Sequence, residues 1–156
     1  MDDRLLHGQV DYSWKAALSY DAIVIVSDSA AKDEMRKMAL KLCCPDGVKL
    51  AVRTVDAGAE LLKNPKLKNM KVFVIAPDPE TVYRLTKLID EKPVINIGGM
   101  QMHDEKKMFS KAVYVDQTDV DYMDKLEAKG YKLEIQEVPA TPVYEYQSVR
   151  KKYGGK

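Results

Sequence analysis

The sequence predicts an α/β fold, in which helices cover both faces of an open, mostly parallel, twisted sheet with an antiparallel strand at one edge. Short apolar runs alternate with amphipathic segments along the chain, as they do in β-α units. Two of these runs, 22–26 and 72–76, are almost continuously β-branched, which is typical of strands covered on both faces. The length of 156 residues suits one domain, which we expect to span residues 1–156.

Six apolar runs are the candidate strands. They are residues 22–26, 48–52, 72–76, 94–97, 112–115 and 131–138. In the last run, apolar and polar residues alternate, which indicates a strand with one solvated face. We therefore place this strand near an edge of the sheet.

Apolar residues recur at helical spacing between the strands, and we interpret two such stripes as facing the core. They are Val10, Trp14, Ala17 and Leu18, followed by Ala31, Met35, Met38, Ala39 and Leu42. Residues typical of helix starts are Asp28 or Ser29, Asp56, Asp78 with Pro79, and Thr118 or Asp119. The segment 139–156 shows no such pattern, and we expect a loosely packed tail there.

Composition excludes several classes of function. Lys and Arg number 25 against 24 Asp and Glu, so neither nucleic acid nor an anionic membrane surface is favoured as a partner. No apolar run approaches the roughly 20 residues that span a bilayer, and a cytoplasmic protein is expected. The adjacent Cys43 and Cys44 suit neither an ordinary disulfide nor a zinc site, so we expect buried thiols, and no metal or cofactor.

The densest cluster of reactive side chains precedes the first predicted helix. His7 offers a ring nitrogen that can attack phosphorus and later release the group, which makes it a candidate nucleophile. Arg4 adds a charged fork for phosphoryl oxygens, and Gln9 adds a neutral donor. Gly8 and the free N–H groups of the helix start would form a cradle for an anion. A structural or capping role for a lone histidine at this position is the alternative.

Two further groups end predicted strands, where open α/β sheets place their ligand loops. The first is Asp28 with Ser29, and the second is Asn96 with Gly98 and Gly99. Both are candidate borders of the site, although helix capping and a simple turn explain them as well. His103 lies among charged residues and is expected to be a solvated surface residue.

The segment Asp2-Asp3-Arg4-Leu5-Leu6-His7-Gly8-Gln9-Val10 resembles the D-D-R-L-I-H-G-Q-V motif of enzyme IIB components of the mannose/fructose/sorbose family of the bacterial phosphotransferase system. The resemblance spans about residues 1 to 138. It continues through Val26-Ser27-Asp28-Ser29-Ala30, Glu34-Met35-Arg36-Lys37, Ile95-Asn96-Ile97-Gly98-Gly99-Met100 and Lys111-Ala112-Val113-Tyr114-Val115.

The resemblance implies a phosphocarrier. His7 would accept a phosphoryl group on Nδ1 from a phosphohistidine of the IIA component and pass it to a sugar delivered by the membrane components IIC and IID. Arg4 and Gln9 would contact the phosphoryl group, Gly8 would belong to the backbone cradle, and Asp3 would either orient a neighbour or cap the turn. The protein would meet the inner face of the membrane transiently, through IIC and IID; a homodimer is left open.

Family members have a hydrophobic strand before the motif, whereas this sequence starts at Met1. We favour numbering from an internal start over a shortened homologue. A different hypothesis is a non-catalytic regulatory or partner-binding domain that keeps the fold, but the intact set of Arg4, His7, Gly8 and Gln9 argues against it. A nucleotide-binding protein is disfavoured because neither G-x-G-x-x-G nor G-x-x-x-x-G-K-[ST] occurs.

Overall fold

The computed structural model describes residues 1–154, apart from the side chain of Gln9. Its first sheet has the strand order β2-β1-β3 and contains β1 (Ala22–Val26), β2 (Lys49–Arg53) and β3 (Val72–Ile75). Both neighbours run parallel to β1, and every residue of β1 is buried. The continuous β-branched run of β1 is therefore explained by cover on both faces.

The second sheet has the order β4-β7-β8 and contains β4 (Ile95–Ile97), β7 (Leu133–Ile135) and β8 (Tyr144–Glu145). The strand predicted over 131–138 is shorter, as β7, and lies next to the edge rather than at it, because β7 pairs in parallel with β4 and antiparallel with β8. The antiparallel edge strand is β8. A hairpin of β5 (Lys107–Ser110) and β6 (Val113–Val115) completes the strands, so the α/β class is confirmed but the sheet is divided.

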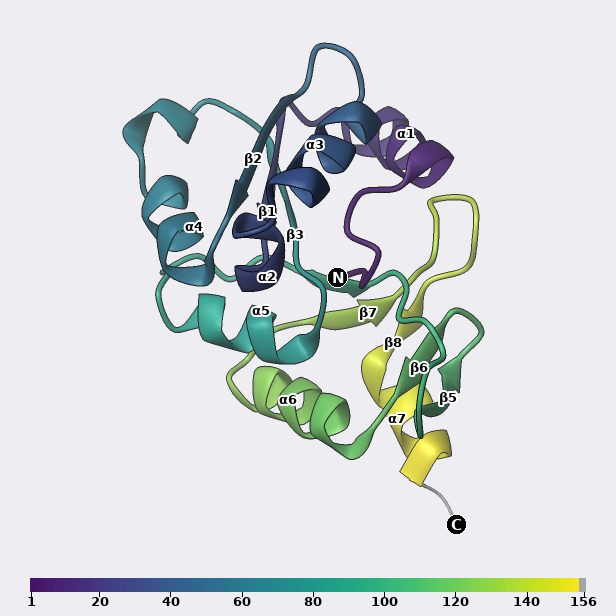
Figure 1. Cartoon of the computed structure of the whole chain (residues 1–156). Coiled ribbons are helices and arrows are strands. Elements are labelled where there is room, and N and C mark those ends of the chain that lie inside the picture. Colours follow the sequence, from purple (N-terminus) through teal and green to yellow (C-terminus); the bar gives the residue numbers. More distant parts are fainter. Residues whose placement is uncertain (155–156) are drawn as a thin grey trace.

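Seven α-helices and one short 3₁₀ helix surround the sheets in the described part of the chain (Figure 1). They are α1 (Gly8–Leu18), α2 (Asp28–Ala31), α3 (Glu34–Cys43), α4 (Val55–Leu62), η1 (Pro65–Leu67), α5 (Pro79–Thr86), α6 (Gln117–Ala128) and α7 (Tyr146–Gly154). Helices α1, α2 and α3 pack on the face of β1 that carries Ile23 and Ile25, whereas α4 and α5 pack on the face of Val24 and Val26. Helices on both faces are thus confirmed for the first sheet.

Side-chain caps set the helix starts. Asp78 caps α5 with Pro79 in its first turn, as predicted. The single helix predicted from Asp28 or Ser29 is divided into α2 and α3, because Ser27 and Asp33 each cap a separate start.

Two other predicted helix starts lie inside their helices. Thr54 caps α4, so Asp56 lies in its first turn. Asp116 caps α6, and Asp119, the third residue of that helix, forms a capping box with it.

The apolar stripe of α3 was predicted to face the core, but it points outward. Met35, Met38 and Leu42 are 83%, 68% and 88% exposed, whereas Leu40 is 5% exposed. The rotation of α3 is set by Leu40, which packs with β1 in the core, and the apolar stripe then faces away. Cys43, which ends this helix, is half-buried rather than buried, as is Cys44.

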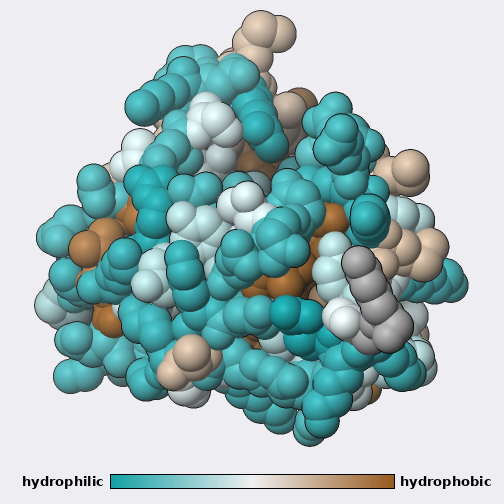
Figure 2. Space-filling model, turned by 90° about the horizontal axis from the view of Figure 1, so that it is seen from below, coloured by the Kyte–Doolittle hydropathy of each residue, from teal (hydrophilic) through white to brown (hydrophobic). Residues whose placement is uncertain are grey.

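One face of the molecule is largely polar. Figure 2 shows the face seen from below as mostly hydrophilic, with hydrophobic atoms visible only in small, separate areas. Within residues 1–154, none of the helices has the length and apolar character needed to cross a bilayer.

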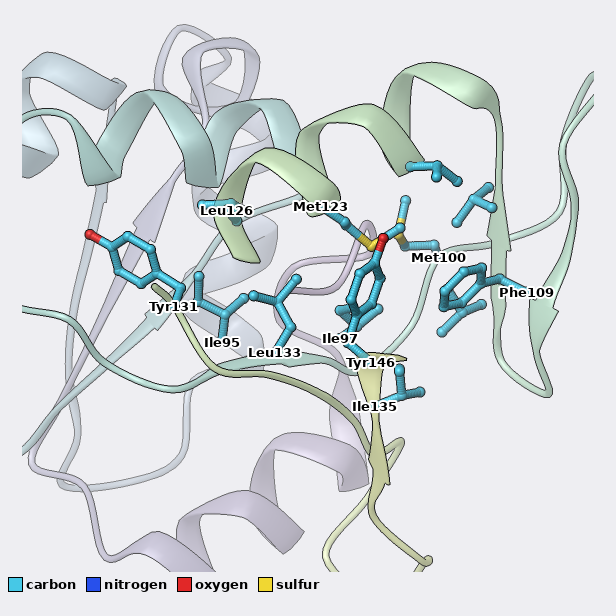
Figure 3. Packing of buried hydrophobic residues seen from close by; sticks show 13 residues of the cluster. Ile95, Ile97, Met100, Phe109, Met123, Leu126, Tyr131, Leu133, Ile135 and Tyr146 are labelled. Atoms are coloured by element: carbon cyan, nitrogen blue, oxygen red, sulfur yellow. The ribbon is translucent and has the colours of Figure 1, made fainter. Parts of the chain in front are cut away.

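The prediction of a loosely packed tail from residue 139 was also wrong for the described residues. Strand β8 extends the second sheet, and α7 follows it directly. Tyr146 is 1% exposed and lies beside Phe109 in the core of the second sheet, with ring centroids 5.8 Å apart (Figure 3). Its hydroxyl donates to Asp124 Oδ1 at 2.6 Å, and Arg150 forms an ion pair with the same carboxylate. One buried aromatic side chain thus anchors the tail.

We expect Tyr146→Ala to lower the free energy of unfolding by about 3 to 5 kcal/mol, because it leaves a cavity where a large aromatic side chain packs. Tyr144→Ala is the control, since Tyr144 is half exposed, and it should cost less than about 1 kcal/mol. Urea denaturation of both variants measures the difference. Equal losses in the two variants would show that α7 is not anchored through Tyr146.

Candidate functional site

The segment Met1–Asp3 lies between the ends of β3 and β4. The N–H of Asp2 donates to the carbonyl of Ala76, the residue after β3, at 3.0 Å. On the other side, the N–H of Gly98 donates to the carbonyl of Met1 at 2.8 Å, and the N–H of Asp3 donates to that of Gly99 at 3.1 Å. The segment therefore sits at the carboxyl ends of parallel strands, where this fold class places its ligand loops.

Two leucines then turn the chain and fix it to the core. Leu5 and Leu6 are 1% and 3% exposed and pack with the residues of β1. Leu5 has a φ of 62°, a left-handed conformation that is rare for a branched side chain, and its N–H donates to the carbonyl of Asp2 at 3.0 Å. Such conformations persist where the surroundings enforce them, often in functional loops. This turn presents Arg4 and His7 at the surface.

One carboxylate holds both of these side chains. Oδ1 of Asp2 accepts from the backbone N–H and from Nε of Arg4, at 3.0 and 3.2 Å. Oδ2 of Asp2 lies 3.1 Å from Nη2 of Arg4 and 3.1 Å from Nε2 of His7. An ionised carboxylate only accepts, so Nε2 of His7 is assigned the proton, and Nδ1 of a neutral ring keeps its lone pair.

Helix α1 starts at this histidine. His7 is the N-cap residue, but its side chain makes no capping bond. Gly8 has a φ of 49°, which favours glycine, and no neighbouring atom would lie within 4 Å of a Cβ there. The first-turn N–H groups of a helix have no partner within the helix, so this start can receive an anion. The backbone of Gln9 belongs to α1, whereas its side chain lies outside the described part.

A buried carboxylate stabilises the same turn by binding its backbone. Asp11 is 3% exposed and accepts a hydrogen bond from the backbone N–H of His7. Burial raises the pKa of the Asp11 carboxyl to about 6, although the bond from His7 opposes the rise. The hydroxyl of Tyr20 donates to the backbone carbonyl of Asp11 at 2.9 Å, which fixes α1 further.

The loop after β4 closes over Asp2 and Arg4. A Cβ added at Gly99 would lie 3.0 Å from Nη2 of Arg4 and 3.0 Å from Oδ2 of Asp2, so only glycine fits without displacing that pair. Asp3 joins the same loop, because its Oδ2 accepts from the N–H of Gln101 at 2.6 Å. Asn96 contributes its carbonyl, which accepts from the amino group of Met1 at 2.6 Å. The structure thus brings Asn96, Gly98 and Gly99 to the loop of His7.

The other candidate border residues make different contacts. Asp28 accepts from the N–H of Val55 at 3.0 Å and from Nη1 of Arg84 at 2.8 Å, and these bonds lower the pKa of its carboxyl. Ser29 lies beside Ser27, with their hydroxyl oxygens 3.3 Å apart. These bonds connect α2 to α4 and α5 and do not reach the His7 loop. His103 is exposed beside Asp104, as expected of a surface residue.

Sequence reasoning did not single out Asp2, although this residue makes the central contacts of the site. The signal in the sequence that could have identified Asp2 was its position at the start of the motif that contains Arg4 and His7. Within residues 1–154, no group of three or more His, Cys, Asp or Glu side chains is placed to hold a metal ion.

The buried Asp11 carboxyl gives a pH dependence of known sign. Its pKa rises from 3.8 to about 6 on folding, so the folded protein binds this proton more tightly, and the free energy of unfolding falls as pH rises through that interval. Asp11→Asn keeps an acceptor for the N–H of His7 and should remove this loss, which amounts to at most about 3 kcal/mol. Urea denaturation at about pH 4 and about pH 7 measures it. Asp121→Asn, at an exposed position, is the control; equal slopes in both variants would contradict the assignment.

Comparison with known proteins gives one consistent result. The family model described as "PTS system sorbose subfamily IIB component", where PTS denotes the phosphotransferase system, matches residues 1–154. The sorbose-specific EIIB component of Lacticaseibacillus casei is 39% identical over 142 residues, which are 91% of this chain and 87% of that protein. The mannose-specific EIIAB component of Escherichia coli K12 is 34% identical over 142 residues, which are 91% of this chain and 44% of that protein.

A solved structure agrees along the whole chain. The crystal structure of the IIBSor domain of the sorbose permease from Klebsiella pneumoniae matches with a TM-score of 0.93 at 28% sequence identity. The match covers 100% of this chain and 96% of that one. The backbone, the family model and the relatives therefore lead to one conclusion: this chain belongs to the sorbose subfamily of phosphotransferase-system IIB components.

Proposed function

We propose that His7 is the residue on which this IIB component carries the phosphoryl group between the IIA component and the sugar. One observation carries the proposal: the bond between His7 Nε2 and Asp2, which also binds Arg4, leaves Nδ1 with its lone pair at an uncapped helix start. A nucleophile, a fixed positive charge and free backbone donors therefore occur together. A non-catalytic domain would have no use for this combination.

The chemistry consists of two displacements at phosphorus. In the first, the lone pair of His7 Nδ1 forms a bond to the phosphorus of the phosphohistidine on IIA, and the donor N–P bond breaks with its electron pair returning to the donor ring. In the second, a sugar hydroxyl oxygen attacks the phosphorus, the N–P bond of His7 breaks, and the hydroxyl proton leaves to water. The proton on Nε2 of His7 stays in place in both steps.

Arg4 is suited to hold the moving group. Its guanidinium uses Nε and Nη2 for Asp2, which leaves further N–H donors for phosphoryl oxygens. Its side chain is 35% exposed, and that of His7 is 24% exposed, so a donor protein can reach both. Phosphoryl transfer needs mainly positioning and charge stabilisation from the protein, and Arg4 with the first-turn N–H groups of α1 supplies both.

The small cavity near the His7 loop supports a sugar site outside this chain. The cavity between Met1, Asp2, Leu5 and Trp14 has a volume of about 30 Å³. This volume suits about one water molecule and is far smaller than the volume of a typical ligand pocket. The sugar would therefore be presented to His7 by the membrane components IIC and IID.

Replacing His7 tests the carrier directly. We expect His7→Ala to gain no phosphoryl mass when it is incubated with phosphorylated IIA, whereas the parent gains one group per chain. His103→Ala is the matched control, because His103 is the other histidine of the sequence and is exposed. Intact-protein mass spectrometry measures both, and labelling of His7→Ala equal to that of the parent would refute the proposal.

Replacing Arg4 tests charge stabilisation. Arg4→Gln should slow phosphoryl transfer by about 100-fold, because it removes a charged donor from the transition state. Arg4→Lys should give an intermediate rate, since lysine keeps the charge but not the planar fork. Rapid-quench kinetics measure the rate, and calorimetry should show that binding of IIA is retained. A parental rate in Arg4→Gln would exclude this role.

A further inference from the structure

The carboxylate of Asp2 is shared between the candidate nucleophile and its neighbouring cation. It accepts from Nε and Nη2 of Arg4 and lies 3.1 Å from Nε2 of His7, and its own side chain is only 13% exposed. No other residue described in this structure is bonded to both of these side chains. The geometry of Asp2 therefore decides how the other two groups are placed relative to each other.

We infer that Asp2 is a positioning residue: it selects Nδ1 of His7 as the attacking nitrogen and holds Arg4 next to the imidazole. This inference rests on the proposed phosphocarrier role of His7. A neutral imidazole exists in two tautomers, and a carboxylate at Nε2 favours the tautomer that is protonated there. The same bond fixes the ring orientation, so the Nδ1 lone pair points away from Asp2.

The backbone around Asp2 is suited to this task because it is bonded on several sides. Its N–H donates to the carbonyl of Ala76 at 3.0 Å, and its carbonyl accepts from the N–H of Leu5 at 3.0 Å. Asp2 also forms a parallel bridge with Gly99, whose missing Cβ leaves room for the Asp2 and Arg4 side chains. A positioning group acts through such rigidity, because a small displacement of a catalytic group costs rate.

The other carboxylates near His7 make different contacts. Asp11 accepts from the backbone N–H of His7 and not from its ring. Asp3 accepts from the N–H of Gln101. Asp2 is thus the carboxylate that the structure places on the imidazole.

Asp2 also bears on the phosphorylated state. With the phosphoryl group on Nδ1, the N–H at Nε2 still donates to Asp2, so the ring does not turn during either transfer. The two bonds to Asp2 fix the guanidinium of Arg4, and its remaining N–H donors stay free for phosphoryl oxygens.

The experiment compares Asp2→Ala and Asp2→Asn with the parent and with the control Asp121→Asn, which removes an exposed carboxylate on α6. ¹⁵N NMR of the histidine ring reports the tautomer of His7 before phosphorylation. ¹⁵N and ³¹P NMR after incubation with phosphorylated IIA report which nitrogen carries phosphorus. Rapid-quench kinetics separate the transfer rate at saturating IIA from the affinity for IIA.

We expect the parent and Asp121→Asn to show the tautomer protonated at Nε2 and phosphorus on Nδ1 alone. Asp2→Ala should show mixed tautomers, a fraction of phosphorus on Nε2, and a transfer rate about 10- to 100-fold lower, with affinity for IIA within about twofold. Asp2→Asn should lower the rate less, since the amide oxygen still accepts from His7. A merely structural role would not move the phosphorus between nitrogens.

The outcomes separate this inference from the proposed function. Absence of labelling in the parent, or labelling of His7→Ala, would overturn the phosphocarrier role itself. Normal labelling of the parent with a parental tautomer, nitrogen and rate in Asp2→Ala would overturn only the role of Asp2. If Asp2→Ala does not fold, Asp2→Asn decides, and a parental transfer rate in that variant would overturn the inference.

Discussion

The backbone hydrogen bonds of Met1–Asp3 connect the two halves of this molecule and place its functional loop. On one side the segment is bonded to Ala76, after β3, and on the other to Gly98 and Gly99, after β4. Each three-stranded sheet has its own buried cluster, and no strand pairing joins β3 to β4. The position of His7 relative to the loop after β4 therefore depends on this short bonded segment and on the burial of the leucines that follow it.

The site combines groups that stabilise the fold with groups that oppose it. Burial of Leu5 and Leu6 favours the folded state, whereas the left-handed conformation of Leu5 and the buried carboxyl of Asp11 oppose it. Oδ1 of Asp3 is also buried without a hydrogen-bond partner among the described residues. Costs of this kind concentrate in functional loops, because catalytic geometry and optimal stability place different demands on the same residues.

Local sequence signals identified the two long β-branched strands and the cap of α5, since periodicity and capping depend on near neighbours. The same signals predicted the wrong buried face for α3, because the rotation of a short helix is decided by what it packs against. They also missed β8 and α7. The pairing partner of β8 is β7, and the anchor of Tyr146 lies among residues far away in sequence.

For the site, the sequence by itself supplied the candidate residues: a histidine, an arginine and a glycine at a helix start, within a motif that identified the family. These residues are adjacent in the chain, so their joint presence needs no knowledge of the fold. The tertiary structure alone decided which nitrogen of His7 is bonded, that Asp2 holds both His7 and Arg4, and that Gly99 closes over that pair while Asp28 binds elsewhere. The physical reason is that hydrogen bonds and close packing depend on distances between side chains, which a one-dimensional spacing does not fix.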